Sequence, residues 1–589
     1  MKKLYITLIF LLVSLLVTTS GTAASSGHIG LLTVSESSLN SSNPGLEKGG
    51  VADLYLVIKQ GSGRIFIDSF PLSKIDTQIT MRFATEVACD LLEKDCSNYD
   101  FFYTITANSA IVGGPSAGAA ATVLTVALLD NQQLSNNTIM TGTINSGNLI
   151  GPVAGVPAKA LAAQVNGYTR VLIPEWDIAN NTPQNLSIMV TPISTLEEAL
   201  YYFTGKNYSI NDNAVIHSTE YNNIMREVTL DLCSKYGSVT NGVLILPNLT
   251  AYDINLTNAS QDNFKLAINA INNNSYYSAA SFCFGGNVKI TSSLFKNMTN
   301  DQLKILYAQL LENISTFEKD FDSKSGKLST ISELETYMIV AERLYDTKNI
   351  LSQLDIDNIS SAELAYARER FSTAIVWERF SVIPGQKFVL DHDLLKIACA
   401  KKLSEAEERI NYMELYFPKK DIREELSKAY NYYYQNDYAL CIFTASKVKA
   451  QSDIVLSAIF VPEDNMQRLL EEKINAGRRA ISRQESANIF PILGYSYYEY
   501  ANTLKDTDQY SSLLYAEYSL ELSNLDMYFK KRPPVQIIDV VNTNYVYVFV
   551  IGAISGIIFT TIVLVLFRII ITHIKNSSVK KNAVKKRKK

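Results

Sequence analysis

The order of apolar and polar positions predicts a strand, a tight loop and a buried helix around residue 115. Residues 101–112 are rich in β-branched and aromatic side chains, as expected of a strand. Residues 117–129 carry no charge and consist mainly of Ala, Val and Leu, as expected of a buried helix. The loop between them contains Gly114, Pro115 and Ser116, so Ser116 lies at a strand–loop–helix junction.

This junction has two interpretations, an ordinary turn or part of an active site. A helix start carries partial positive charge, so backbone N–H groups around Gly114, Pro115 and Ser116 can point at a developing negative oxygen. Ser116 is then a candidate nucleophile. Such glycine-rich segments are usually plain turns, and a second chemical group is needed to choose between the two.

Lys159 supplies that second group. It is the only charged residue in the small, apolar stretch 151–163, where Pro157 predicts a helix start. Burial disfavours the ammonium form, and only the neutral amine can take a proton from a serine hydroxyl. The alternative is a surface lysine on an amphipathic helix.

Together these motifs resemble the proteolytic domain of Lon proteases, which use a Ser-Lys dyad without a catalytic histidine. The resemblance covers residues 27–205. Its motifs are the Gly-Pro-Ser-Ala-Gly turn at 114–118, Met-Thr-Gly at 140–142, the segment 155–159 and the strand-like run 170–174.

The resemblance implies an α+β domain in which Ser116 is the nucleophile and Lys159 the general base. Thr141 is implied as the hydroxyl that orients the lysine amine. Two positions depart from the family pattern, because Gly113 and Thr143 stand where acidic residues are usual. None of the four histidines lies between the serine and the lysine, which disfavours a Ser-His-Asp triad.

Both ends of the chain indicate a membrane setting. Residues 1–24 combine a basic start, an apolar run and small residues, which predicts a secretory signal peptide, with an uncleaved anchor as the alternative. Residues 540–567 carry no charge and predict a transmembrane helix. The tail 568–589 is basic and has no acid, which predicts a cytoplasmic tail near lipid headgroups and an N-terminal ectodomain outside.

The rest of the ectodomain changes character along the chain. Residues 211–300 are interpreted as a mixed connecting region with a strand-like run at 242–246. Residues 301–529 show helical periodicity, and the segments 429–439 and 495–518 resemble tetratricopeptide-type helix hairpins. This helical domain is either an array that binds a partner or a spacer. Expected cysteine pairs are Cys89 with Cys96, Cys233 with Cys283, and Cys399 with Cys441, among 15 possible connectivities.

Composition narrows the function further. The net charge of −4 gives no reason to expect a nucleic-acid partner, and no Cys/His cluster suggests a metal. No phosphate-binding loop of an ATPase is found, so no cofactor is expected. The sequence therefore resembles exported, membrane-anchored archaeal serine proteases of the Lon type that act on peptides without ATP. An inactive surface scaffold or receptor is the alternative, and the Gly552 and Gly556 spacing leaves a homo-oligomer open.

Overall fold

The computed structural model describes residues 24–34, 49–177, 186–208, 218–244, 250–323, 328–529 and 543–586. Contacts divide the chain into two units, Met1–Lys531 and Arg532–Lys589, which are described separately. The expected signal peptide lies outside the described residues except for Ala24.

A seven-stranded sheet forms the N-terminal part of the first unit, in the order β3-β4-β2-β1-β5-β8-β9. β1 pairs antiparallel with β2 and β2 with β4, whereas β3–β4, β1–β5, β5–β8 and β8–β9 are parallel. The strand bounds are β1 Ser25–Val34, β2 Gly49–Gln60, β3 Ile65–Ser73, β4 Tyr99–Val112, β5 Thr138–Met140, β8 Arg170–Pro174 and β9 Met189–Ile193. A short hairpin, β6 (Thr143–Ile144) with β7 (Ile150–Gly151), follows β5.

Helices α3 (Ile75–Leu91), α4 (Gly118–Leu129), α5 (Val156–Val165) and α6 (Leu196–Thr204) pack with the sheet. α4 is buried on nearly every side, as its uncharged sequence predicts, and forms the centre of the α/β core. The expected strand and helix around Ser116 are therefore confirmed. β2 is an element that the sequence interpretation missed, although its alternating residues Ala52, Leu54, Leu56 and Ile58 are buried.

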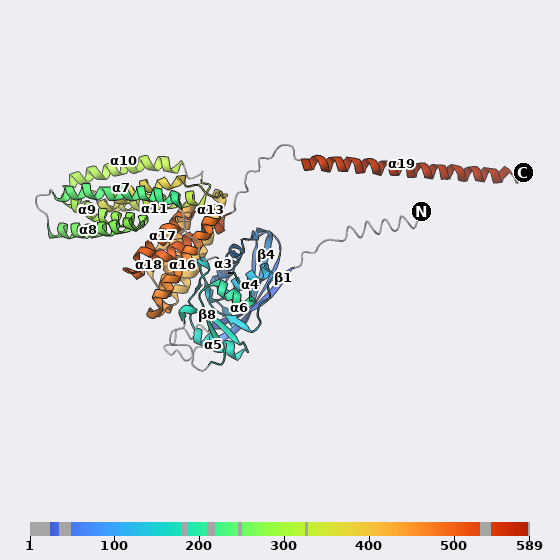
Figure 1. The fold of residues 1–589 in the computed structure, drawn as a ribbon, viewed down its shortest axis with the longest axis horizontal. Helices are drawn as coiled ribbons and strands as arrows, with labels where there is room; N and C mark the ends of the chain where they lie inside the picture. The colour runs from blue at the N-terminus through green and yellow to red at the C-terminus, as the bar shows by residue number, and fades with distance from the viewer. Residues whose placement is uncertain are drawn as a thin grey trace. The chain divides into compact units, whose positions relative to one another are not determined.

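The remainder of the first unit is helical (Figure 1). Its helices are α7 Thr219–Leu244, α8 Ala251–Asn272, α9 Tyr276–Lys296, α10 Asn300–Asp322, α11 Ile331–Gln353, α12 Ser361–Trp377, α13 His392–Glu414, α14 Lys420–Tyr434, α15 Tyr438–Phe460, α16 Glu463–Ser486, α17 Ile492–Leu504 and α18 Gln509–Leu522. Capping boxes begin several of them, for example Thr250 with Asp253 and Thr330 with Glu333. Asparagines in the left-handed conformation follow others, such as Asn436 after α14.

The mainly helical character expected of this region is confirmed, and both expected helix hairpins are present as α14–α15 and α17–α18. The mixed region expected over 211–300 is wrong in its described part. α7 continues through residues 242–244, where a strand was expected, because Met225, Val228 and Leu232 bury one face of this helix against its neighbours. Residues 245–249 lie outside the described residues.

All three expected disulfides are confirmed. Cys89–Cys96 links the end of α3 to the turn before β4. Cys233–Cys283 joins α7 to α9, and Cys399–Cys441 joins α13 to α15. The two longer links tie helices that are separated along the chain, so they reinforce the packing of the helical region.

The second unit contains α19 (Thr543–Lys586). Within it, Val550–Thr572 is long and apolar enough to cross a membrane. This segment overlaps the expected span 540–567 and extends beyond it to include Arg568; residues 540–542 lie outside the described residues. Its apolar side chains, such as Phe559 and Leu564, are exposed within the unit, as expected of a surface that faces lipid.

Candidate active site

The loop after β4 has the shape of a sharp turn that presents a serine. Gly114 adopts φ 101° and ψ 154°, a backbone conformation that residues with a Cβ rarely take. A short 3₁₀ turn, Pro115–Ala117, then leads into α4. Gly118 packs so closely that a Cβ there would lie 3.0 Å from both Ile144 and Thr80. Ser116 is half-buried on this turn, next to a helix start.

The segment after β5 holds this turn in place. The Ser116 carbonyl accepts a hydrogen bond from the Gly142 N–H at 3.1 Å and a long one from the Thr141 hydroxyl at 3.5 Å. In return, the Ala119 N–H donates to the Gly142 carbonyl at 3.2 Å. These reciprocal bonds fix Ser116 relative to Thr141.

Lys159 reaches the same threonine from the other side. It lies in the first turns of α5, after Gly155 in the left-handed conformation. The residue is 2% exposed, and its Nζ donates to the Thr141 hydroxyl oxygen at 3.2 Å. Thr141 therefore contacts the serine backbone and the lysine amine together, so the three residues named from the sequence meet at one place.

Asp177 is a titratable group near Lys159 that the sequence did not reveal. It lies directly after β8, in the 3₁₀ turn Glu175–Asp177, and accepts a hydrogen bond from the Val153 N–H at 3.1 Å. Burial raises the pKa of Asp177 to about 7, against the opposing effects of this bond and of the Lys159 charge. Only tertiary packing brings its element beside α5, so no local motif could have indicated it.

Asp76 is a second carboxylate that the sequence did not indicate. Its Oδ2 accepts a hydrogen bond from the Gly114 N–H at 3.1 Å, and its Oδ1 accepts one from the Thr77 N–H at 2.6 Å. The Gly114 amide is thus already occupied, and Pro115 has no N–H. Gly114 and Pro115 shape the turn, and the donor role first expected of that segment falls to the Ser116 N–H.

The helical region forms one side of the site. From α13, Arg409 donates from Nη2 to Asn145 Oδ1 at 2.8 Å and to the Ile144 carbonyl at 3.5 Å. Further along the same helix, the Tyr412 hydroxyl accepts a hydrogen bond from the Ala154 N–H at 3.3 Å. α13 therefore extends from the hairpin beside the serine turn to the loop before Lys159, which argues against a mere spacer.

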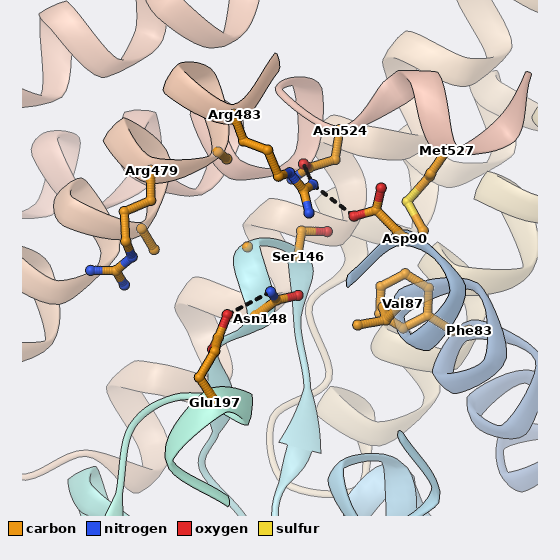
Figure 2. A pocket seen from close by; sticks show the side chains of 13 residues that line it. Phe83, Val87, Asp90, Ser146, Asn148, Glu197, Arg479, Arg483, Asn524 and Met527 are labelled. Atoms are coloured by element: carbon orange, nitrogen blue, oxygen red, sulfur yellow. Dashed lines mark hydrogen bonds and ion pairs between the residues drawn. The ribbon is translucent and has the colours of Figure 1, made fainter. Parts of the chain in front are cut away.

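A second hollow lies where the α/β domain meets the helical region (Figure 2). Arg483 of α16 forms an ion pair with Asp90 of α3 at 2.6 Å, and Asn148 donates to Glu197 at 2.9 Å. The Arg483–Asp90 ion pair joins the two parts of the first unit, whereas the Asn148–Glu197 bond lies within the α/β domain.

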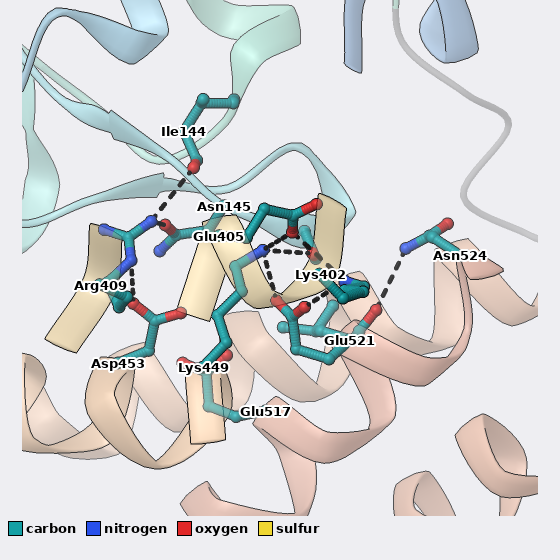
Figure 3. Close-up of polar contacts among 12 residues, drawn as sticks. Ile144, Asn145, Lys402, Glu405, Arg409, Lys449, Asp453, Glu517, Glu521 and Asn524 are labelled. Atoms are coloured by element: carbon teal, nitrogen blue, oxygen red, sulfur yellow. Dashed lines mark hydrogen bonds and ion pairs between the residues drawn. The ribbon is translucent and has the colours of Figure 1, made fainter. Parts of the chain in front are cut away.

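A charged cluster lies inside this junction (Figure 3). We call it the buried charge cluster, and its members are Lys402, Glu405, Glu408, Arg409, Lys449, Asp453, Lys473, Glu517 and Glu521. Lys402 and Lys449 each pair with both Glu405 and Glu521, at 2.8–3.3 Å. Arg409 pairs with Asp453 at 3.0 Å, and Lys473 pairs with Glu517. Among the described residues, no group of His, Cys, Asp or Glu is arranged to hold a metal ion.

Comparison with known proteins agrees with this geometry. Residues 90–202, which include Ser116, Thr141 and Lys159, match the family described as the Lon protease (S16) C-terminal proteolytic domain. Among curated proteins, the chain is 35% identical over 96 residues to the Lon protease of Phenylobacterium zucineum (strain HLK1), covering 15% of this chain and 12% of that protein.

Two further relatives match the chain over longer stretches. It is 28% identical over 144 residues to the Lon protease of Methanosphaera stadtmanae, covering 24% of this chain and 18% of that protein. It is 34% identical over 117 residues to the peroxisomal Lon protease homolog 2 of Bos taurus, covering 19% and 13%. The chain thus spans less than a fifth of the length of each of these three relatives. The family resemblance read from the motifs is confirmed: the N-terminal α/β domain is similar to the proteolytic domain of Lon proteases.

Proposed function

We propose that this chain is a membrane-anchored serine endopeptidase that hydrolyses peptide bonds with a Ser116–Lys159 dyad and without ATP. One observation carries the proposal: Thr141 contacts both the backbone of Ser116 and the amine of the buried Lys159. A hydroxyl in this position fixes the lysine amine and leaves its lone pair available to a neighbouring proton donor.

The reaction follows from these roles. Neutral Lys159 takes the proton of the Ser116 hydroxyl while Oγ attacks the peptide carbonyl. The backbone N–H of Ser116 stabilises the developing oxyanion. The lysine then gives its proton to the leaving amine, and a water molecule hydrolyses the acyl-enzyme by the same steps in reverse order.

Asp177 affects this proton transfer. An ionised carboxylate near Lys159 would stabilise the ammonium form and so oppose its role as a base. Because burial raises the pKa of Asp177 to about 7, the carboxyl group is mostly protonated below neutral pH and this opposition is weakened. The rate should therefore rise with pH as the lysine loses its proton, but less steeply once Asp177 ionises.

The setting of the enzyme is part of the proposal. The segment Val550–Thr572 anchors the chain, and the basic residues from Lys575 onward lie on the cytoplasmic side. The proteolytic domain then faces outward, where ATP is scarce. Protease added to intact cells should leave a tag after Lys589 undigested, and digestion of that tag would reverse the orientation.

Labelling with a fluorophosphonate probe tests the catalytic proposal. Purified full-length protein in detergent should become labelled at Ser116, as identified by peptide mass spectrometry. Ser116→Ala should remove the label while the melting temperature stays unchanged. Equal labelling of the variant, or a wild-type chain that neither reacts nor cleaves peptides, would favour the scaffold alternative.

A further inference from the structure

A small cavity adjoins the serine turn on the side of the helical region. Its volume is about 10 Å³, room for one water-sized group such as an ammonium. Pro115 and Ile144 from the α/β domain form part of its wall, together with Thr80 of α3. Glu405, Glu408 and Arg409 of α13 and Lys449 of α15 also line it. Since Pro115 directly precedes Ser116, this cavity adjoins the turn that carries the candidate nucleophile.

Glu408 forms the longest ion pair of any carboxylate in the buried charge cluster, 3.7 Å to Arg409. Glu405, Glu517 and Glu521 each pair with lysine, and Asp453 pairs with Arg409. The cluster holds the five carboxylates of residues 405, 408, 453, 517 and 521 but only the four cations of residues 402, 409, 449 and 473. One carboxylate is therefore in excess, and the contacts identify it as Glu408.

The surroundings of Glu408 confirm its poor pairing. The residue is 5% exposed, and its Oε1 has no hydrogen-bond partner among the described residues. Its Oε2 lies 3.7 Å from Nε of Arg409, which is closer to Asp453. Burial raises the pKa of Glu408 to about 7; Arg409 and Lys449 oppose the rise, and the nearby Asp453 and Asp76 add to it.

A buried carboxylate without a full partner is unfavourable until a donor or a cation reaches it. A cation that enters the cavity from a bound peptide would complete the charge balance of the cluster. We propose that this cavity is a subsite for an ammonium group of the substrate, recognised by Glu408. The proposal rests on the proposed peptidase function and names the class of peptide that this site prefers.

The ammonium group has two possible sources, a lysine side chain near the cleavage site or the free amino end of the peptide. Fluorogenic peptides that differ only by lysine or norleucine, placed in turn at each position around the cleaved bond, test the first source. The same peptides with a free or an acetylated amino end test the second. Norleucine keeps the length of the side chain and removes its charge.

Full-length wild type in detergent should cleave at least one ammonium-bearing peptide about tenfold faster, in kcat/KM, than its neutral counterpart. Glu408→Gln should reduce this ratio to near one. Glu407→Gln is the matched control, because Glu407 is adjacent on α13 but pairs with Arg423 and does not line the cavity. It should keep the wild-type ratio.

If Glu408→Gln fails to fold, the proposal is decided by wild type alone, from the ratio of its kcat/KM values for ammonium-bearing and neutral peptides. A wild type that cleaves neutral and ammonium-bearing peptides equally, in a reaction abolished by Ser116→Ala, would overturn the subsite and leave the peptidase function standing. An unchanged preference in folded Glu408→Gln would also overturn it. A wild type that cleaves no peptide would overturn both.

Discussion

Replacing Asp76 tests how the serine turn is held. Its carboxylate joins the Gly114 N–H at 3.1 Å to the N-terminus of α3, where it also accepts from the Thr77 N–H at 2.6 Å. The chain has Gly113 where Lon proteases usually carry an acid. Asp76 thus supplies a carboxylate to the same turn from a different element.

The expected size of the effect follows from these contacts. A hydrogen bond to a charged group contributes about 1.5–3 kcal/mol. Asp76→Ala should therefore lower the free energy that stabilises the turn by roughly that amount. If the loss falls on the transition state, kcat decreases about 10- to 100-fold. Asp76→Asn keeps an acceptor without the charge and should lose less.

The assay is peptide hydrolysis by the full-length protein, with kcat and KM measured separately and the melting temperature as a check of folding. We expect Asp76→Ala to lower kcat while the domain stays folded. Asp95→Ala is the control, because Asp95 also accepts a backbone hydrogen bond, from the Ser97 N–H at 2.9 Å, but does so in the turn before β4. Wild-type kcat in Asp76→Ala would refute the reasoning.

Three other substitutions test the packing. Gly114→Ala should destabilise the turn by about 1–3 kcal/mol and lower activity, because φ is 101° there; an unchanged melting temperature would count against this. Arg409→Met should reduce the free energy of unfolding by about 3–5 kcal/mol in urea titrations, since it leaves Asp453 buried and unpaired; a loss below about 1 kcal/mol would contradict it. Burial raises the pKa of Glu499 from 4.5 to about 7, so the folded state holds this proton more tightly and wild type loses stability as pH rises from about 4.5 through 7. The free energy of unfolding of Glu499→Gln, relative to that of wild type, should therefore rise by about 2.5 kcal/mol between pH 5 and pH 8, and a pH-independent difference would disprove the assignment.

The elements and residues that could be predicted from the sequence are those with a local signal. The strand before Ser116 and the helix after it follow directly from the pattern of apolar residues in the sequence. Ser116, Thr141 and Lys159 occupy short motifs, and the structure brings them together through Thr141. β2 also had a local signal in its alternating apolar residues, and the interpretation overlooked it.

The missing parts of the site depend on contacts between distant segments. Asp76 is separated from Gly114 by a strand and a helix, and Asp177 reaches the Lys159 region only through the order of strands in the sheet. Arg409 and Tyr412 belong to a helix more than two hundred residues after the motifs. A helical pattern indicates which face is apolar but does not indicate which surface that face covers.

The strand expected near residue 243 was wrong for a related reason. Its β-branched residues favour a strand locally, but α7 buries Met225, Val228 and Leu232 along one helical face and is tied to α9 by Cys233–Cys283. Tertiary packing and the disulfide therefore outweigh local propensity at the end of this helix.

The central claim is that the amine of Lys159 accepts the proton of Ser116, and Lys159→Arg tests it most directly. Arginine keeps the positive charge but stays protonated at any working pH, so it cannot act as the base. Peptide hydrolysis by the full-length protein should be measured against pH for wild type and Lys159→Arg, with circular dichroism to confirm folding. We predict that the wild-type rate rises with pH while the folded variant is inactive throughout. Substantial hydrolysis by folded Lys159→Arg would contradict the dyad.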